Sequence, residues 1–266
     1  MAQKRRVLLT IAYDGTDYSG FALQKTSPKP TIEGLVNHAI HALTGEEVCV
    51  IGASRTDAGV HALGNVAVFD TESPIPPEKM CFALNPLLPH DVRIISSRAV
   101  DKDFHPRHVP CLKTYRYHIL NAPFDIPTRM RYVHRVPMKL DVDRMQEGAL
   151  FLEGEHDFTS FCSVATQAEN HVRKIEKILM KKSELSDKIF VDEESDDISE
   201  IILEITGNGF LYNMVRIIAG TLIQVGTGAR NPEDVKTMLE AKDRRAAGPT
   251  APPQGLVLNC LKFTEF

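Results

Sequence analysis

The sequence has no tryptophan, few cysteines and no hydrophobic run near the ~20 residues that a membrane-spanning helix needs. Its five cysteines are an odd number and show no C-x-x-C spacing, which argues against a disulfide framework and against a zinc site. Residues 1–6 lead into a strand-like run without the layout of a signal peptide. We therefore expect a cytoplasmic protein with no membrane partner. Its reduced structural cysteines are Cys49, Cys81, Cys111, Cys162 and Cys260.

Two further motif classes are missing. The sequence contains neither a P-loop nor a complete G-x-G-x-x-G element, since Gly207-Asn208-Gly209 lacks the third glycine, and a nucleotide cofactor is therefore not expected. Histidine pairs with suggestive spacing, His38 with His41 and His105 with His108, do not join a third convincing ligand. A metal-dependent hydrolase is thus a weak interpretation, and surface or RNA-facing histidines are the stronger one.

Positive charge is not in excess, because the net charge is −4, but the charges are unevenly distributed. Residues 184–200 carry −7, which leaves +3 for the remainder of the chain. Residues 101–135 carry +4 and four histidines. We interpret the acidic segment as an exposed hairpin tip and the basic segment as a candidate phosphate-facing surface. A solvated charged face is the alternative, so this segment alone does not establish RNA as a partner.

The most informative segment is residues 53–62, Ala-Ser-Arg-Thr-Asp-Ala-Gly-Val-His-Ala, which places one carboxylate in a short turn between two apolar runs. Strands over residues 48–53 and 63–69 would hold Asp57 firmly. Residues i and i+2 share one side of an extended strand, so Arg55 is expected to lie beside Asp57 and to favour its ionised form. Such a carboxylate can be a nucleophile or a general base. The alternative is structural: the Asp57 side chain would only form hydrogen bonds to the backbone of its own turn.

Hydrophobic periodicity predicts the element order β-α-β-β-α-β twice. This order predicts an α+β protein of two ferredoxin-like (split βαβ) halves, residues 1–105 and 106–266, whose antiparallel sheets are joined across a central catalytic cleft. The expected strands are residues 5–13, 48–53, 63–69 and 92–98, then 114–120, 172–182, 198–206 and 256–263. The expected helices are residues 32–43 after a Thr31 cap, 76–84, 142–152 after an Asp141 cap, 211–225, and an extra helix that Asn231 caps and that ends near 241.

Several segments resemble, in the same order, the tRNA pseudouridine synthase A family. Residues 55–61 match the family signature G-R-T-D-A-G-V-H, with Ser54 in place of its first glycine. Residues 13–21 match Y-D-G-x-x-Y-x-G-W, with Phe21 in place of the tryptophan. The remaining matches are residues 103–107 to a D-F-H-A-R-type loop that contacts tRNA, 113–117 to K-x-Y-x-Y, and 154–161, 210–220 and 241–244. The resemblance therefore extends through nearly the whole chain.

The resemblance implies an enzyme that isomerises uridine to pseudouridine on the 3′ side of the anticodon stem-loop of tRNA, with no cofactor and no metal. It also implies a homodimer in which each tRNA contacts both subunits. Asp57 would be the essential carboxylate, and it would either attack the ribose C1′ or the base C6, or remove a ribose proton. The residues alone do not choose between these roles.

The resemblance also assigns roles around the substrate. Arg55 would occupy the space that the extruded uridine vacates, or would simply pair with Asp57. Tyr115 would stack on the flipped base, Arg216 would be a second cation beside Asp57, and Leu256 would form a wall of the pocket. Buried structural roles are the alternatives for Tyr115 and Leu256. The implied RNA-binding loop consists of Phe104, His105, Pro106, Arg107 and His108.

Two rival functions are compatible with parts of the pattern. A hydrolytic nucleoside glycosylase also flips a base, but it generally needs a second acidic residue, and none appears beside Asp57. A non-catalytic protein with two RNA-recognition modules has the same element order. Its strands would carry an aromatic RNP1 pattern, which is missing here, and it would not require Arg-x-Asp in a hairpin.

Overall fold

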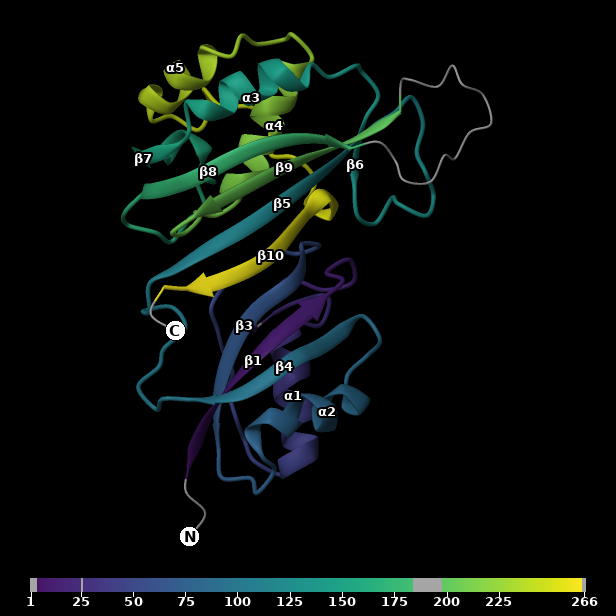
Figure 1. Ribbon diagram of the computed structural model, residues 1–266, viewed down its shortest axis with the longest axis vertical. Coiled ribbons are helices and arrows are strands. Elements are labelled where there is room, and N and C mark those ends of the chain that lie inside the picture. Colours follow the sequence, from purple (N-terminus) through teal and green to yellow (C-terminus); the bar gives the residue numbers. More distant parts are fainter. Residues whose placement is uncertain (1–3, 25, 184–197, 265–266) are drawn as a thin grey trace. The chain divides into compact units, whose positions relative to one another are not determined.

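The computed structural model describes residues 4–24, 26–183 and 198–264, and it divides the chain into two compact units (Figure 1). The first unit consists of Met1–Cys111 and Val257–Phe266, and the second of Leu112–Leu256. The sequence placed the last strand in the second half. That strand belongs instead to the first unit, because β10 (Leu256–Phe263) runs parallel to β3 (His61–Thr71) and pairs with its beginning. Most of the acidic segment, residues 184–197, lies outside the described residues.

In the sheet of the first unit, antiparallel pairs join the strands in the order β4-β1-β3-β2, and β10 runs parallel to the beginning of β3. Its elements are β1 (Arg5–Tyr13), α1 (Ile32–Thr44), β2 (Ile51–Gly52), β3, α2 (Met80–Leu84) and β4 (Val92–Val100). Helix α1 has the expected ends. The Thr31 hydroxyl accepts from the Gly34 N–H, and Gly45 terminates the helix in the left-handed region with φ 73°.

Two elements of the first unit are shorter than expected. Strand β2 contains only Ile51 and Gly52, because the chain leaves the sheet directly afterwards to form the loop of residues 53–60. The expected helix over residues 76–84 is divided into a 3₁₀ turn at Pro77–Lys79 and the short helix α2. Both faces of β1 are buried: Val7, Leu9 and Ile11 are inaccessible on one face, and Leu8 packs in a cluster with Phe104 on the other.

The second unit has the strand order β5-β9-β8-β7 with antiparallel neighbours, and β6 runs parallel to β5. Its elements are β5 (Cys111–Asn121), β6 (His134–Val136), α3 (Val142–Leu150), β7 (Gly154–Asp157), β8 (Val172–Ser183), β9 (Ser199–Gly207), α4 (Met214–Gly226) and α5 (Asp234–Ala241). Helix α3 contacts α4, α5 and β8. Asp141 caps α3 as expected, since its carboxylate accepts from the Arg144 N–H.

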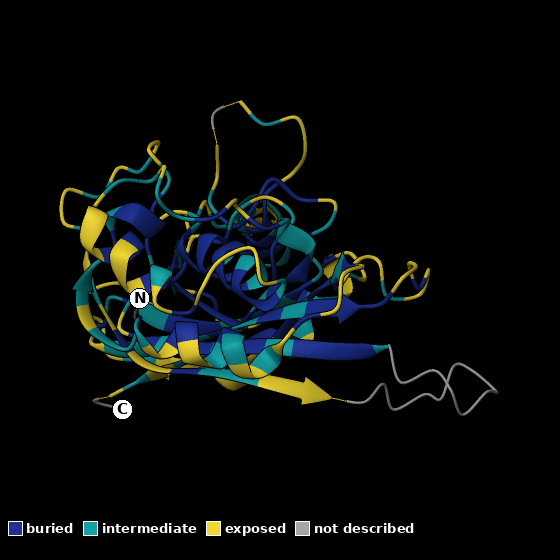
Figure 2. Ribbon diagram, turned by 90° about the horizontal axis from the view of Figure 1, so that it is seen from above, coloured by how far each residue is buried: buried dark blue, intermediate teal, exposed yellow. Residues whose placement is uncertain are grey.

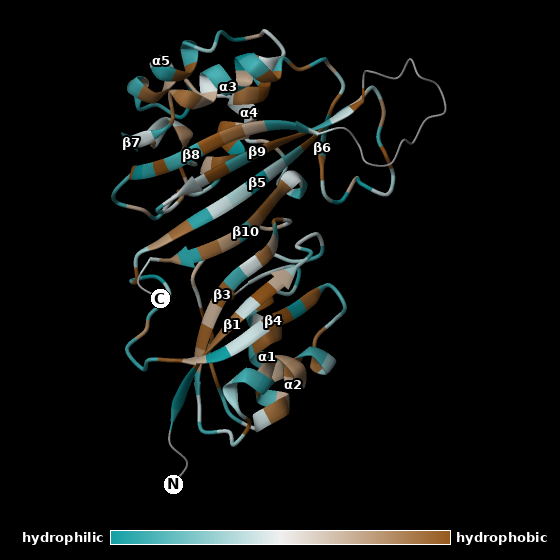
Figure 3. Cartoon of the chain, viewed as in Figure 1, coloured by the Kyte–Doolittle hydropathy of each residue, from teal (hydrophilic) through white to brown (hydrophobic). Residues whose placement is uncertain are grey.

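Alternation along β5 and β9 separates a hydrophobic face from a polar one (Figure 3). On β5, Tyr115, Tyr117 and Ile119 are buried, whereas Arg116 and His118 on the opposite face are partly accessible. Figure 2 shows buried residues concentrated in the strands, with exposed residues on outer helix faces and loops.

Among the residues that the structure describes, no helix has both the length and the apolar character to cross a membrane.

Two helix starts in the second unit differ from the expectation. Helix α4 begins at Met214 and not at Leu211, because Asn213 takes a left-handed conformation with φ 60° that no helix can include. Helix α5 begins at Asp234, and the expected Asn231 cap is wrong: Asn231 instead donates its own backbone N–H to the Asp234 carboxylate. Side-chain and backbone hydrogen bonds of this kind are not readable from periodicity.

Candidate active site

The loop that carries Asp57 extends from β2 and turns back into β3. The Ala53 N–H donates to the Val66 carbonyl at 2.7 Å, so the loop starts while still attached to β3. The Val60 N–H donates to the Asp57 carbonyl at 3.2 Å and closes the turn. Asp57 is half-buried, whereas Ser54 and Thr56 on the same loop are buried. The Asp57 carboxylate is therefore presented by a closed turn at the end of a sheet.

Residues 13–21 form a bed against which this loop packs backbone to backbone. The Phe21 N–H donates to the Thr56 carbonyl at 3.1 Å, and the Gly59 N–H donates to the Tyr18 carbonyl at 3.3 Å. Glycine is required at Gly20 because its φ is 85° and because an added Cβ would lie 2.5 Å from the Thr56 carbonyl oxygen. The matched Y-D-G-x-x-Y-x-G pattern therefore has a structural role: its backbone groups bond the Asp57 loop, and Gly20 allows the two segments to approach closely.

His61 ties the same two segments together at the start of β3. Its Nδ1 lies 3.0 Å from the Gly15 N–H and 3.1 Å from a carboxylate oxygen of Asp14, and its ring is buried. An unprotonated Nδ1 accepts from Gly15, whereas a protonated Nδ1 donates to Asp14. Either protonation state therefore keeps one hydrogen bond between residues 13–21 and the start of β3, which directly follows the Asp57 loop.

Arg55 does not pair with Asp57 as the sequence suggested. Its side chain is exposed and forms no ion pair with any acidic residue that the structure describes, Asp57 included. The rule that places residues i and i+2 on one side applies to extended strands, and residues 53–60 leave the sheet after Gly52. The simple ion-pair role for Arg55 is therefore wrong for this structure, and the guanidinium remains available for a ligand.

Arg107 contributes a second guanidinium beside this loop. Its Nε donates to the Gly52 carbonyl of β2 at 2.8 Å, which attaches residues 101–110 to the strand that precedes Asp57. Burial, and next the nearby Arg55 cation, lower the pKa of Arg107. Two like charges held close together beside this loop form a candidate site for a phosphate group.

The expected RNA-binding loop is only partly accessible. The Phe104 side chain is 3% exposed and packs edge-on against Phe263 with ring centroids 5.2 Å apart, so it is a core residue. Pro106 is buried as well. The rings of His105 and His108 stack 3.9 Å apart, and burial, followed by the charge of His108, lowers the pKa of His105. The side chains that this loop presents to solvent are therefore those of His105, Arg107 and His108.

In the second unit, the expected substrate residues surround a buried tyrosine that the sequence did not single out. Tyr115 packs edge-on against Phe210, with ring centroids 5.1 Å apart. Two residues later, the Tyr117 hydroxyl donates to the Pro252 carbonyl at 2.8 Å, and a Cβ on Gly255 would lie 2.8 Å from the Tyr117 ring. Leu256 follows directly and is 5% exposed. The period of two from Tyr115 was the signal that could have identified Tyr117.

Arg216 is fixed at the start of α4. Its Nε donates to the Ala251 carbonyl at 2.7 Å and its Nη1 donates to the Asn213 side-chain oxygen at 2.8 Å. Burial raises the pKa of Tyr117, and the Arg216 cation acts against this rise. The Tyr117 hydroxyl and the Arg216 Nε donate to the carbonyls of the consecutive residues Pro252 and Ala251. The hydrogen bonds to these consecutive carbonyls bring Tyr117 and Arg216 together in the second unit.

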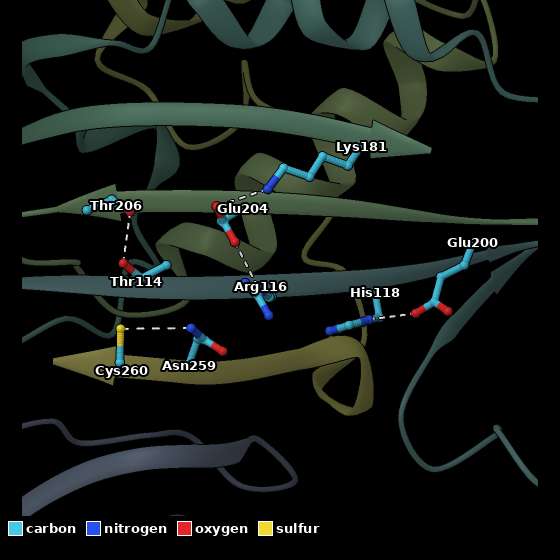
Figure 4. A network of polar contacts seen from close by, with 9 residues as sticks. All are labelled: Thr114, Arg116, His118, Lys181, Glu200, Glu204, Thr206, Asn259 and Cys260. Atoms are coloured by element: carbon cyan, nitrogen blue, oxygen red, sulfur yellow. Dashed lines mark hydrogen bonds and ion pairs between the residues drawn. The ribbon is translucent and has the colours of Figure 1, made fainter. Parts of the chain in front are cut away.

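The polar face of the second unit carries ion pairs that neutralise part of the expected basic surface (Figure 4). Glu204 lies 2.7 Å from Arg116 and 3.4 Å from Lys181. Glu200, which the sequence counted in the acidic tip, is instead buried, lies 2.6 Å from His118 Nδ1 and also pairs with Arg129. Arg116 and Arg129 are therefore held by carboxylates of their own unit.

No group of three or more His, Cys, Asp or Glu side chains that would hold a metal ion occurs within residues 4–24, 26–183 and 198–264. A cavity of about 180 Å³ in the second unit is lined by Leu120, Ile126, Val133, His134 and Gln254 among others. This volume is below the roughly 300–1,000 Å³ of typical ligand pockets. We therefore place the candidate chemistry at the Asp57 loop.

The Asp57 loop thus carries a carboxylate on a turn that buried contacts hold, and the Arg55 and Arg107 guanidinium groups lie near one another at the same loop, an arrangement suited to an anionic substrate. The family described as tRNA pseudouridine synthase matches residues 9–108 and 149–264. The chain is 45% identical over 254 residues to tRNA pseudouridine synthase A of Brevibacillus brevis, which covers 96% of this chain and 98% of that protein. It is 46% identical over 259 residues to tRNA pseudouridine synthase A 2 of Clostridium tetani, with 97% and 99% covered. The chain therefore belongs to the tRNA pseudouridine synthase family.

Proposed function

We propose that this protein isomerises uridine to pseudouridine in tRNA, at uridines of the anticodon stem-loop, with Asp57 as the essential carboxylate. The observation that carries the proposal is the Asp57 loop itself. Its sequence matches the family signature, and buried contacts to residues 13–21 hold it rigid while Asp57 stays half-buried. The near-full-length similarity to proteins named for this activity supports the same assignment.

The proposed reaction requires that Asp57 is ionised and that the target uridine is extruded from the RNA stem. Asp57 attacks the ribose C1′, attacks the base C6, or removes a ribose proton. Each route breaks the bond between ribose C1′ and the base nitrogen N1 and forms a bond from C1′ to C5, and the C5 proton is lost while N1 gains one. A stacked uridine must first leave the stem. Arg55 suits that step, because it is exposed and forms no ion pair that would have to be broken first.

Among the residues of the second unit, we assign base stacking to Tyr115, a cation to Arg216 and an apolar wall to Leu256. Arg107, His105 and His108 would contact the RNA backbone, since their side chains are the accessible ones in their loop. Phe104 and Pro106 would act by holding that loop in shape.

The proposal extends to architecture and assembly. The order of neighbouring strands supports two ferredoxin-like halves. This order is β4-β1-β3-β2 in the first unit and β5-β9-β8 in the second, so strands that follow one another in the chain are not always neighbours in the sheet. A homodimer and a cytoplasmic location fit a tRNA-modifying enzyme of this family. No cofactor enters the proposed reaction.

The test compares wild-type protein with Asp57→Asn on an unmodified tRNA transcript. The substitution is nearly isosteric and removes only the charge, so we expect pseudouridine formation to fall by about four orders of magnitude while tRNA affinity stays within about threefold. Pseudouridine is mapped by chemical labelling and primer extension, and affinity by gel shift. Asp125→Asn is the matched control: this carboxylate is half exposed and pairs with Arg135, and its loss should leave the rate unchanged.

Pseudouridine formation by Asp57→Asn at the wild-type rate would contradict the assignment. Release of free uracil by the wild type would favour a hydrolytic glycosylase instead. Modification confined to another region of the tRNA would keep the activity but exclude the anticodon stem-loop as the target.

A further inference from the structure

Three buried side chains form a polar network beneath the Asp57 loop. The Tyr13 hydroxyl lies 2.7 Å from Thr56 Oγ1, and the Asn65 side-chain amide donates to the Tyr13 hydroxyl at 3.2 Å. The same amide donates to the Ser54 carbonyl at 3.0 Å. Tyr13, Thr56 and Asn65 are 4%, 6% and 0% exposed. The network therefore connects β1 and β3 to the loop on both sides of Arg55.

The direction of these hydrogen bonds follows from the chemistry of the groups. The Ser54 carbonyl can only accept, so the Asn65 atom that contacts it is the NH₂ group, while Asn65 Oδ1 accepts from the Val66 N–H at 2.9 Å. The Tyr13 oxygen thus accepts from Asn65, and in its hydrogen bond with Thr56 Oγ1 either hydroxyl can be the donor. Burial raises the pKa of Tyr13, which keeps the phenol protonated and able to donate.

The network fixes the residue that directly precedes Asp57. Thr56 is held through its side chain by Tyr13 and through its carbonyl by the Phe21 N–H. Ser54 is held through its carbonyl by Asn65. Arg55, which lies between them, remains exposed. The backbone is therefore fixed at the residue before Asp57, while the Arg55 side chain stays accessible.

We infer that Tyr13 is a positioning residue for the reaction: its hydroxyl, oriented by Asn65, holds Thr56 and thereby sets the direction of the Asp57 carboxylate. This inference rests on the proposed role of Asp57. A reacting group must be held within about 0.5 Å of its productive geometry, and a loop achieves this only when neighbouring side chains fix it. The residue acts through Thr56 and does not itself contact the reacting atoms.

The test is a double-mutant cycle of Tyr13→Phe and Thr56→Val, which removes each hydroxyl with little change in shape. We expect each variant to lower kcat about tenfold with KM within twofold of wild type, because binding surfaces are intact and only the aim of the carboxylate is lost. The double variant should be no slower than Tyr13→Phe, since that substitution already removes the hydrogen bond with Thr56 together with the one from Asn65. Thr56→Ser restores the hydroxyl and should recover most of kcat.

Thr71→Val is the matched control. Thr71 is also a buried threonine of the first unit whose hydroxyl bonds a side chain, Glu46 at 2.5 Å, but it lies at the opposite end of β3. The Thr71→Val variant should have a lower free energy of unfolding, as Thr56→Val should, but its kcat should equal that of the wild type. A kcat of Tyr13→Phe within twofold of wild type, additive effects in the cycle, or an equal fall in kcat for Thr71→Val would each overturn the inference. Failure of the proposed function is distinguishable, because Asp57→Asn would then remain active.

Discussion

The Asp57 loop of the first unit and the polar sheet face of the second unit are both rich in polar side chains, but they use them in opposite ways. On the sheet face, carboxylates and cations neutralise one another, as Glu204 does with Arg116 and Lys181. On the loop, hydroxyls and backbone groups form the contacts, and Arg55 forms no ion pair with a described residue.

The contrast separates structural charges from functional ones. A cation that is already paired must lose its partner before it can bind a phosphate, and the exchange has little net benefit in water. A cation without a partner binds at no such cost. The segment of residues 101–135 therefore has fewer cations available to a phosphate than its +4 charge suggested, because Arg116, Arg129 and Arg135 pair with carboxylates.

The largest expected effect on stability comes from breaking the sheet face at Glu200. A hydrogen bond from His118, opposed by burial and assisted by Arg129, keeps the pKa of Glu200 below its usual value. Glu200→Gln should lower the free energy of unfolding at pH 7 by about 2 kcal/mol, as measured by urea denaturation. Because the folded pKa lies below the unfolded value of about 4.3, the ionised carboxylate stabilises the fold above that pH and stops doing so as the pH falls through the folded pKa.

The difference between wild type and Glu200→Gln should accordingly shrink on acidification from pH 7 to pH 4 and below. Asp125→Asn is the control, since its pair with Arg135 is exposed and worth no more than about 0.5 kcal/mol. A Glu200→Gln variant as stable as Asp125→Asn, with an unchanged pH profile, would show that the pairs on this face are not structural.

The next largest effect tests the loop. Arg55→Lys keeps the charge but loses the planar fork of donors, and we expect it to slow turnover about tenfold on a native stem. The measurement is single-turnover pseudouridine formation on two substrates, one with the target uridine paired and one with it already unpaired. The unpaired substrate should recover most of the rate. Equal defects on both substrates would exclude base extrusion as the role of Arg55.

A smaller effect compares one arginine from each region. Arg107→Gln should weaken tRNA binding about threefold and lower the slope of log affinity against log salt by about 0.9, the value for one lost phosphate contact. Arg116→Gln makes the same change in charge at a residue paired with Glu204 and should leave the slope unaltered. A larger change of slope for Arg116→Gln than for Arg107→Gln would place the RNA on the sheet face.

The smallest effect concerns Ser54, which stands where the family signature has glycine. Its hydroxyl is buried and has no hydrogen-bond partner among the described residues, whereas the buried hydroxyl of Ser160 accepts from the Asp243 N–H at 2.9 Å. Ser54→Ala should raise the free energy of unfolding by up to about 1 kcal/mol, and Ser160→Ala should lower it by about 1 kcal/mol. Changes of the same sign in thermal or urea unfolding would contradict the assignment of an unpaired hydroxyl at Ser54.

Local sequence patterns predicted most elements of the fold. The caps at Thr31 and Asp141, strand β1 and strand β10 have the expected bounds, because alternation and capping residues act over a few neighbours. The starts of α4 and α5 were predicted wrongly, since a left-handed Asn213 and a backbone hydrogen bond of Asn231 depend on the surrounding loops. The unit to which β10 belongs could not be predicted, because strand pairing joins residues almost two hundred positions apart.

The sequence by itself determined the family, the position of Asp57 and the glycines that let residues 13–21 approach its loop, since each of these depends on residue identity at fixed spacing. Only the tertiary structure decided which charges are paired. It left Arg55 without an ion pair to Asp57, attached Arg107 to Gly52 and buried Glu200 between His118 and Arg129. The physical reason is that an ion pair or hydrogen bond depends on a distance of a few ångströms, and that distance is set by packing between segments that are remote in the chain.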